Sequence, residues 1–276
     1  MNLDVIPWSN MRVKMLTISR FTLTAFVSLA VCQAQSYRAP RTADGKPNFN
    51  GIWQAMNTAN WDLEAHSARG PHFSGMGAIG AEPSGLGVVE GGTIPYLPAA
   101  LEQKKKNFAN RLALDPETKC YMPGVPRATY MPYPFQIIQS TNKILFAYEY
   151  ASTERLVNMG KPIDPPDNSW MGQSNGRFEG DILVIDSLGF NDSTWFDRAG
   201  NFHGEDLKVT ERYTMVSPDV MNYEATITDP KTFSRPWKIS MPLYRRQEKN
   251  MQLGEFKCVE FAEELLYGHL RKQPSK

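Results

Sequence analysis

Residues 207–228 read LKVTERYTMVSPDVMNYEATIT, and this stretch decides the fold. Apolar or aromatic residues stand at alternate positions in both of its halves, which is the period of a β-strand with one buried face. Ser217-Pro218-Asp219 separates the halves and is typical of a tight turn. The stretch therefore predicts two antiparallel strands, over 207–215 and 220–228.

The same period continues on both sides of this hairpin. Further strands are expected over 135–140, 143–150, 152–159, 177–178, 182–188 and 237–245. Thr141-Asn142 and Glu179-Gly180-Asp181 are typical hairpin turns, and short connections of this kind predict an antiparallel meander. Closing into a barrel or folding as a sandwich removes or shortens the exposed edges of such a meander. We therefore predict an all-β protein with one lipocalin-like β-barrel, and a sandwich is the alternative.

The chain before residue 135 is richer in loops. Residues 35–134 hold one expected strand, over 49–53, and one expected helix, over 98–112. The proline-rich stretch over 120–134 is expected to be neither helix nor central strand. The sequence thus divides into a loop-rich N-terminal segment, 35–134, and a barrel, 135–276, that ends in a short helix over 259–267.

The first 34 residues are typical of a secretory signal. Three basic residues precede an apolar run over 21–31: Arg12, Lys14 and Arg20. The run is shorter than the ~20 residues that span a bilayer, and small residues follow it. We expect cleavage after Ala34, a periplasmic or secreted protein, and no membrane insertion afterwards. Lipoprotein processing at Cys32 is the alternative, which the bulky Val31 disfavours, and translation starting at a later methionine stays open.

Cleavage after Ala34 leaves two cysteines, Cys120 and Cys258. Two cysteines in an oxidising compartment predict a disulfide. The bond would close a loop of about 140 residues, worth about 4–5 kcal/mol in the chain-entropy model. Two buried free thiols are the alternative. Neither cysteine lies in a C-x-x-C motif, so the sequence gives no support for a redox role.

Composition excludes several classes of protein. The chain has 30 Lys and Arg against 29 Asp and Glu, so no general electrostatic affinity for nucleic acid is expected. The motif Gly75-Met76-Gly77-Ala78-Ile79-Gly80 matches G-x-G-x-x-G, but the prolines and glycines around it prevent the helix that a dinucleotide site requires. Four histidines are too few for a His-rich metal site. We expect neither a metal nor a cofactor.

A connection of about fifteen residues, longer than a meander needs, is expected over 191–205. It holds Trp195, Asp197, Arg198 and His203. Hairpin loops commonly span about 2–5 residues, so a longer polar and aromatic loop on a rigid β scaffold is a candidate site. Asp197 and His203 are expected to pair, which would tune the histidine as an acid or base. In the plainer alternative, Asp197 and Arg198 cap turns and His203 bonds to backbone.

Two carboxylates fall on the apolar faces of expected strands. They are Glu211 and Glu149. A carboxylate among apolar neighbours must pair with a cation or take up a proton. Such groups are functional candidates, and structural ion pairs with Arg155 or Arg127 are the alternative.

The loop and the strand that follows it together predict an acid–base site at one end of the barrel. His203 is the expected acid or base, Asp197 its orienting group and Glu211 the second carboxylate. Arg198 or Tyr130 is the expected oxyanion donor. The residues expected to contact a substrate are Trp195, Arg198, Tyr130, Glu149 and Arg212.

Several motifs resemble a family of uncharacterised secreted proteins from acidobacteria and proteobacteria. The shared positions in this chain are Asp44-Gly45-Lys46-Pro47, Gly51-Ile52-Trp53, Trp170, Gly172, Ser174, Gly176, Glu179-Gly180-Asp181, Gly189-Phe190, Trp195, Asp197, Gly200, His203, Glu211-Arg212, Asp229-Pro230 and Pro236-Trp237. The chain departs from the family pattern at Phe178, where the family has Trp, and at Gly204, where it has Ser. The resemblance implies secretion and one shared site, without an established activity.

Two function classes follow for the barrel. In the first, the protein is an enzyme that acts on a small, largely apolar or aromatic molecule by acid–base chemistry, as an isomerase, dehydratase or hydrolase. In the second, it is a periplasmic carrier of a small hydrophobic ligand, which the same residues only orient. An envelope protein without a ligand is the third and weakest class. Whether His203 and Glu211 converge on one cavity distinguishes the first two.

Overall fold

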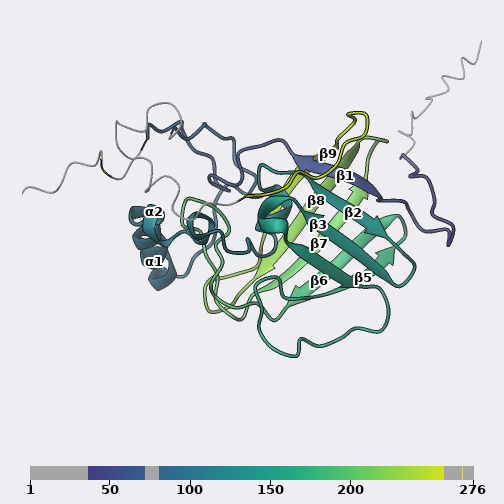
Figure 1. Ribbon diagram of the computed structural model, residues 1–276. Helices are drawn as coiled ribbons and strands as arrows, with labels where there is room; N and C mark the ends of the chain where they lie inside the picture. The colour runs from purple at the N-terminus through teal and green to yellow at the C-terminus, as the bar shows by residue number, and fades with distance from the viewer. Residues whose placement is uncertain (1–36, 72–80, 258–268, 270–276) are drawn as a thin grey trace, which may run out of the picture. The chain divides into compact units, whose positions relative to one another are not determined.

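The computed structural model describes residues 37–71, 81–257 and 269, and nine strands within them form one closed β-barrel (Figure 1). In chain order the strands are β1 (Gly51–Ala55), β2 (Phe135–Gln139), β3 (Lys143–Tyr148), β4 (Glu154–Asn158), β5 (Gln173–Glu179), β6 (Ile182–Leu188), β7 (Lys208–Met215), β8 (Val220–Thr228) and β9 (Trp237–Arg245). Each strand pairs with the next, and β1 pairs with β9 to close the barrel. The barrel predicted from the alternation is confirmed.

One strand pair departs from the antiparallel meander. β4 and β5 are parallel, whereas the other pairs are antiparallel. Residues 159–172 carry the chain back along β5, where the side chain of Asn175 donates to the carbonyl of Ile163 and accepts from its N–H, both at 2.9 Å. A parallel pair needs a returning connection of this length, and alternation within the strands cannot distinguish it from a long hairpin loop.

The N-terminal segment supplies one wall of the barrel. β1 lies between β2 and β9, although it precedes the expected barrel boundary at residue 135. Its Trp53 is fully buried, and the indole N–H donates to the carbonyl of Phe49 at 3.0 Å. Residues 35–134 therefore do not form a separate unit beside a complete barrel.

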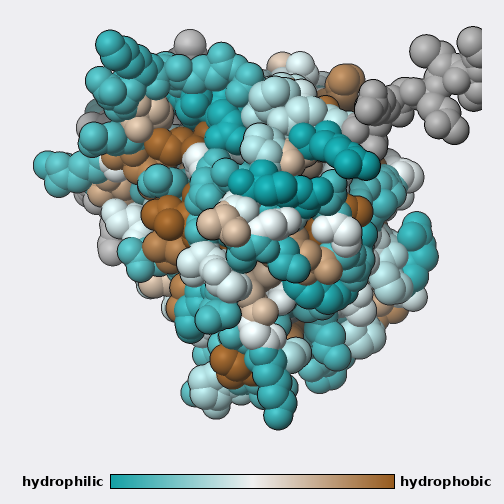
Figure 2. Space-filling view, turned by 90° about the vertical axis from the view of Figure 1, so that its right-hand side faces the viewer, coloured by the Kyte–Doolittle hydropathy of each residue, from teal (hydrophilic) through white to brown (hydrophobic). Residues whose placement is uncertain are grey.

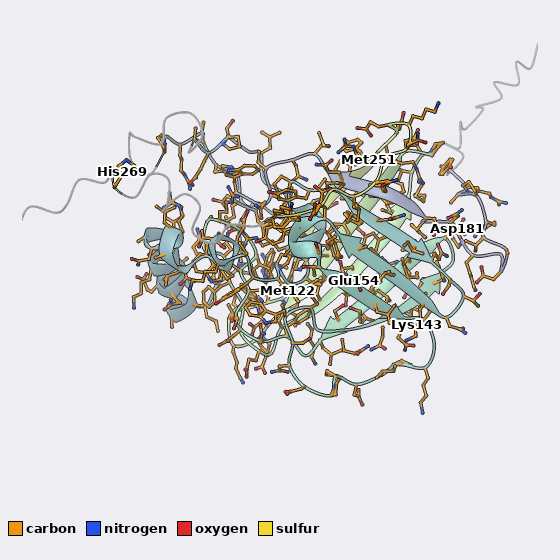
Figure 3. The ribbon with its side chains drawn as sticks, in the orientation of Figure 1. Met122, Lys143, Glu154, Asp181, Met251 and His269 are labelled. Carbon is orange, nitrogen blue, oxygen red and sulfur yellow. The ribbon has the colours of Figure 1, made fainter. Side chains whose placement is uncertain are left out.

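The two ends of the barrel differ. The short β2–β3, β5–β6 and β7–β8 turns share one end, the turn end, which Lys143 and Asp181 mark in Figure 3. The opposite end, the capped end, is covered by one turn of helix, α3 (Arg127–Tyr130), and by residues 191–205. Phe196 of this loop accepts a hydrogen bond from Tyr130 at 2.8 Å and packs edge-on against Trp237 at the start of β9.

The helices are short. α1 (Pro98–Ala109) and α2 (Arg111–Leu114) together cover the helix expected over 98–112. α3 lies inside the proline-rich stretch, so the prediction of no helix there is wrong for these four residues. Pro126 occupies the N-cap of α3. The helix does not use the N–H of that position, so proline is tolerated there. Two further turns of helix in the described part of the chain are η2 (Pro116–Lys119) and η3 (Tyr150–Ser152).

Alternate strand residues point into the barrel, and the space that they fill is called the lumen here. On β7 the inward positions are Val209, Glu211, Tyr213 and Met215, as the alternation predicts. Burying each large apolar side chain contributes about 1.5–3 kcal/mol. The outer surface is different in kind: hydrophilic residues cover most of the face drawn in Figure 2, with smaller hydrophobic areas between them.

Three predictions concern residues outside the described part of the chain: the signal over 1–34, Cys258 and the helix over 259–267. Among the residues that are described, no helix has the length and apolar character to span a bilayer.

Candidate functional site

A polar cluster lies inside the apolar lumen. Arg155 of β4 and Glu211 of β7 form an ion pair, with side chains that are 1% and 0% exposed. The hydroxyls of Tyr213 and Tyr223 both donate to Oε1 of Glu211, at 2.9 Å each. Glu211 is therefore a paired carboxylate, and its partner is Arg155, one of the two arginines that the sequence offered.

Two serines complete the contacts of Arg155. Nε donates to Oγ of Ser174 and Nη2 to Oγ of Ser187, both at 2.8 Å. Ser174 and Ser187 lie opposite each other across β5 and β6, so a small polar side chain from each strand reaches the guanidinium. Burial opposes the charge of Arg155, but Glu211 beside it raises its pKa well above the ordinary value.

Three atoms beside this pair have no hydrogen-bond partner among the described residues. They are Nη1 of Arg155, the hydroxyl of Tyr148 at the end of β3, and Oγ1 of Thr129 in α3. All three side chains are buried. Burial raises the pKa of Tyr148, and the charge of Arg155 together with the polar side-chain groups of Arg155 and Thr129 near its hydroxyl opposes that rise. The three groups lie near one another, but they do not meet hydrogen-bond geometry. Leaving a buried polar atom unpaired costs about 1–3 kcal/mol, so a cluster of such atoms requires an explanation.

Aromatic rings surround the cluster. Phe135 packs against Tyr148 with ring centroids 5.5 Å apart, and Phe146 packs against Tyr213 at 5.6 Å. The guanidinium of Arg155 lies 5.5 Å from the centroid of Phe146. The lumen thus presents a few fixed polar groups within an aromatic wall, which is the usual composition of a small-molecule site.

His203 does not lie in this cluster. Its Nδ1 donates to the carbonyl of Gly204 at 2.9 Å, which leaves Nε2 to accept from the hydroxyl of Thr194 at 2.6 Å. Burial lowers the pKa of His203, and its ring packs against Phe190 and Phe196. The contacts are those of a neutral, fully bonded histidine in the cap.

Asp197 has its own partners. Its carboxylate accepts from the backbone N–H of Leu63, Ala199 and Asn201, and from the side chain of Asn201 at 2.6 Å. Burial and the charge of Asp62 raise the pKa of Asp197 to about 7. The Asp197–His203 pair expected from the sequence is not formed, because each side chain is bonded to other groups of the cap, and Asp197 also to Leu63.

The predicted catalytic residues therefore belong to three separate sets of contacts. Glu211 bonds to groups in the lumen, whereas Asp197 and His203 bond to different parts of the cap. No partner is shared between any two of them. The structure does not bring the three residues together.

The predicted substrate contacts are also dispersed. The hydroxyl of Tyr130 donates to Phe196, and Trp195 is buried in the cap. Arg212 faces the outer surface, where it pairs with Glu179 at 2.8 Å. None of the hydrogen bonds and ion pairs described for these three side chains joins the lumen cluster.

The observed position of Glu149 differs from the predicted one. The sequence predicts Glu149 on one face of β3 with Leu145 and Ala147. The strand instead ends at Tyr148, and its buried face carries Ile144, Phe146 and Tyr148. Glu149 lies beyond the strand, and its carboxylate accepts from the N–H of Gly254 at 2.7 Å. The prediction that it faces the core is wrong, because the strand alternates from Ile144.

A second charged cluster, missed in the sequence, fixes the cap. Arg127 donates to Asn60 at 2.9 Å, to Asp115 at 3.0 Å and to Glu117 at 2.6 Å. Arg198 binds the same Glu117 through Nε at 2.8 Å. Burial alone would raise the pKa of Glu117, but the two arginines lower it to about 2. Arg198 therefore ties the loop to η2, which is a different task from stabilising an oxyanion.

The members of the lumen cluster differ in how far the sequence reveals them. Tyr213 stands two residues from Glu211 on a strongly alternating strand, and Arg155 is an obvious counter-charge. Ser174 and Ser187 become visible only through the β5–β6 register. Thr129 leaves no sequence signal, since it enters from a helix inside a proline-rich stretch.

In the described part of the chain, no group of three or more His, Cys, Asp or Glu residues is arranged to hold a metal ion. Comparisons with protein-family models, with curated proteins and with solved structures find no match for this chain. The chemistry of the lumen cluster is therefore what supports a functional proposal.

Proposed function

We propose that the protein is a carrier that binds one small, largely apolar or aromatic molecule inside its barrel without catalysis. One observation carries the proposal: Nη1 of Arg155, the hydroxyl of Tyr148 and Oγ1 of Thr129 are buried together without partners among the described residues. The large majority of buried polar side-chain atoms in folded proteins have a partner. A bound molecule with one polar group would supply the missing partner.

The aromatic wall indicates that the rest of this ligand is apolar or aromatic. Phe135, Phe146 and Tyr148 lie next to the unpaired atoms and offer ring faces and edges. Binding sites for small molecules are lined in this way, with a few polar groups that set the orientation.

Catalysis by His203 has less support than carriage. Both ring nitrogens of His203 are bonded within the cap, and Glu211 is held by Arg155 and two tyrosine hydroxyls. An acid or base must have a proton or a lone pair within reach of the substrate. These groups are committed to the protein itself.

An acid–base enzyme remains the second candidate, and Asp197 favours it. Burial and the charge of Asp62 raise the pKa of Asp197 to about 7, near the pH at which an acid or base exchanges protons. Its oxygens accept hydrogen bonds from Leu63, Ala199 and Asn201, so this candidate also requires one of these bonds to break. Carbon-13 NMR of labelled aspartate tests this directly. Titration of Asp197 near pH 7 supports the candidate, and titration below about pH 5 removes its basis.

Export to the periplasm or the medium is part of the proposal. The basic residues before the apolar run over 21–31 support it. N-terminal sequencing of protein from the native envelope fraction should begin near Gln35. An intact first methionine on cytoplasmic protein would contradict export.

Equilibrium dialysis with 2-ethylnaphthalene, an apolar aromatic probe, tests carriage. The wild-type protein should bind about one probe per chain and saturate. Ala225 points into the lumen from β8 and Thr226 points outward, so Ala225→Phe should abolish binding whereas Thr226→Phe, with the same added ring, should retain it. Equal binding by both folded variants, or none by the wild type, would contradict a lumen site.

A further inference from the structure

We infer that the polar group of the ligand is a neutral hydrogen-bond acceptor, such as the carbonyl oxygen of a ketone, aldehyde, ester or amide. The inference rests on the proposed carrier function and assigns the class of ligand. It follows from which atoms are unpaired in the lumen and from the charge already present there.

The unpaired atoms are donors. Nη1 of Arg155 can only donate, and the hydroxyls of Tyr148 and Thr129 can donate as well as accept. A single oxygen with two lone pairs can accept from two such groups at once. An ammonium group has no lone pair, so it would leave the fixed N–H of Arg155 unpaired.

The charge inside the lumen is already balanced. Arg155 and Glu211 are the only charged residues that are buried within the described strands, and they neutralise each other. A carboxylate or sulfonate on the ligand would place a second anion beside Glu211 in a dry interior, without a second cation. The balance therefore selects a neutral ligand over an anionic one.

The phenol of Tyr148 stays protonated at neutral pH. Burial raises its pKa above the ordinary value, so a proton is present on the hydroxyl for donation. Its ring is also held in place, since the rings of Phe135 and Phe146 pack against it at 5.5 and 6.3 Å. The donor is thus oriented before any ligand arrives, which reduces the entropy lost on binding.

Three probes with one ring system separate the ligand classes. They are 2-acetylnaphthalene with a neutral carbonyl, 2-naphthoate with a carboxylate, and 2-ethylnaphthalene with no polar group. We expect the ketone to bind the wild-type protein at least about tenfold more tightly than either of the others, as two added hydrogen bonds allow. Equilibrium dialysis at neutral pH measures all three affinities.

Single variants test which side chain causes the preference for the ketone. Tyr148→Phe should remove most of the advantage of the ketone, about five- to tenfold, and leave the affinity for 2-ethylnaphthalene unchanged. Tyr244→Phe is the matched control, because Tyr244 is exposed on β9, and it should change neither. If Tyr148→Phe fails to fold, Thr129→Val and the ranking by the wild-type protein still decide.

The outcomes separate this inference from the proposed function. Tighter binding of 2-naphthoate would overturn it, since Arg155 would then recognise an anion. Equal binding of the ketone and 2-ethylnaphthalene would also overturn it, and would mean that water pairs the buried donors while the carrier function stands. Binding of none of the probes would reject the carrier function itself.

Discussion

Arg155 and Glu211 join two strands that are separated by two others in the barrel. They come from β4 and β7, which are not neighbours in the sheet, and they meet in the lumen with almost no solvent exposure. The pair therefore links two walls of the barrel through its interior. Such a pair contributes modestly to net stability, but removing one partner leaves a buried charge unpaired.

Arg155→Met should lower the free energy of unfolding by about 3–5 kcal/mol, because the charge of Glu211 would remain buried alone. The double variant Arg155→Met, Glu211→Met should be more stable than this single variant. Urea unfolding of both variants measures the two values. Arg212→Gln is the control: it removes an exposed ion pair with Glu179 and should cost under about 1 kcal/mol. Similar losses at residues 155 and 212 would contradict a dry lumen.

Removing the hydroxyl group from two tyrosines of the lumen should change the free energy of unfolding in opposite directions. In the absence of ligand, Tyr148→Phe should raise the free energy of unfolding by about 1 kcal/mol, since it removes a buried hydroxyl without a partner. Tyr223→Phe should lower it by about 1.5–3 kcal/mol, since its hydroxyl donates to the charged Glu211. Urea unfolding of the ligand-free protein gives both values. An equal loss in the two variants would mean that the hydroxyl of Tyr148 is paired.

His203 should make the protein less stable as the pH falls. Burial lowers its pKa against the smaller opposing effects of Gly204, Asp229 and Asp192, so the folded state holds the neutral form. This stabilisation is complete above the unfolded pKa of about 6.5 and is lost as the pH falls below it, by at most about 1.4 kcal/mol per pH unit.

The measurement for His203 is the difference between wild-type protein and His203→Gln in urea unfolding at pH 7.5 and 5.5. The difference is needed because Asp197 acts in the opposite direction. Its raised pKa of about 7 gives stability below about pH 4 that is lost as the pH rises towards 7. Equal pH dependence in wild type and variant would contradict a neutral, buried His203.

Cys120 and Cys258 should be joined by a disulfide. The ring of Phe256 packs 4.8 Å from that of Tyr150, whose hydroxyl donates to the carbonyl of Glu117, and the N–H of Cys120 donates to the same carbonyl. Cys258 follows Phe256 by two positions in the sequence. Peptide mapping of exported protein without reductant should recover the linked pair, and Cys258→Ser should cost about 4–5 kcal/mol. Recovery of both thiols free would contradict the bond.

The fold can be predicted from the sequence because the alternation of apolar and polar residues along a strand is a local property. The two strands over 207–228 are observed almost as predicted. Along β7 and β8, buried residues alternate with residues that are partly or fully exposed. The parallel β4–β5 pair was not accessible, because it depends on the path of residues 159–172. Nor was the position of β1, which pairs with strands distant in sequence.

The sequence predicts the site less well than the fold, because the site depends on which side chains meet in three dimensions. Glu211 was identified as a misfit on an apolar face, and the ion pair with Arg155 is the alternative that the sequence itself offered. The role predicted for His203 assumed that a polar loop faces a ligand. In the structure, cap contacts use its polar atoms instead. Its partners are the carbonyl of the next residue, Gly204, and the hydroxyl of Thr194, and nothing in the sequence distinguishes these from the other polar groups of the loop.

A crystal structure of the protein with 2-acetylnaphthalene tests the central claim most directly. We predict the probe inside the barrel, with its carbonyl oxygen within hydrogen-bond distance, about 2.7–3.2 Å, of the hydroxyl of Tyr148 and of Nη1 of Arg155. Its rings should lie against Phe135 and Phe146. A lumen that holds only ordered water between these donors, with the probe absent or on the outer surface, would contradict the account.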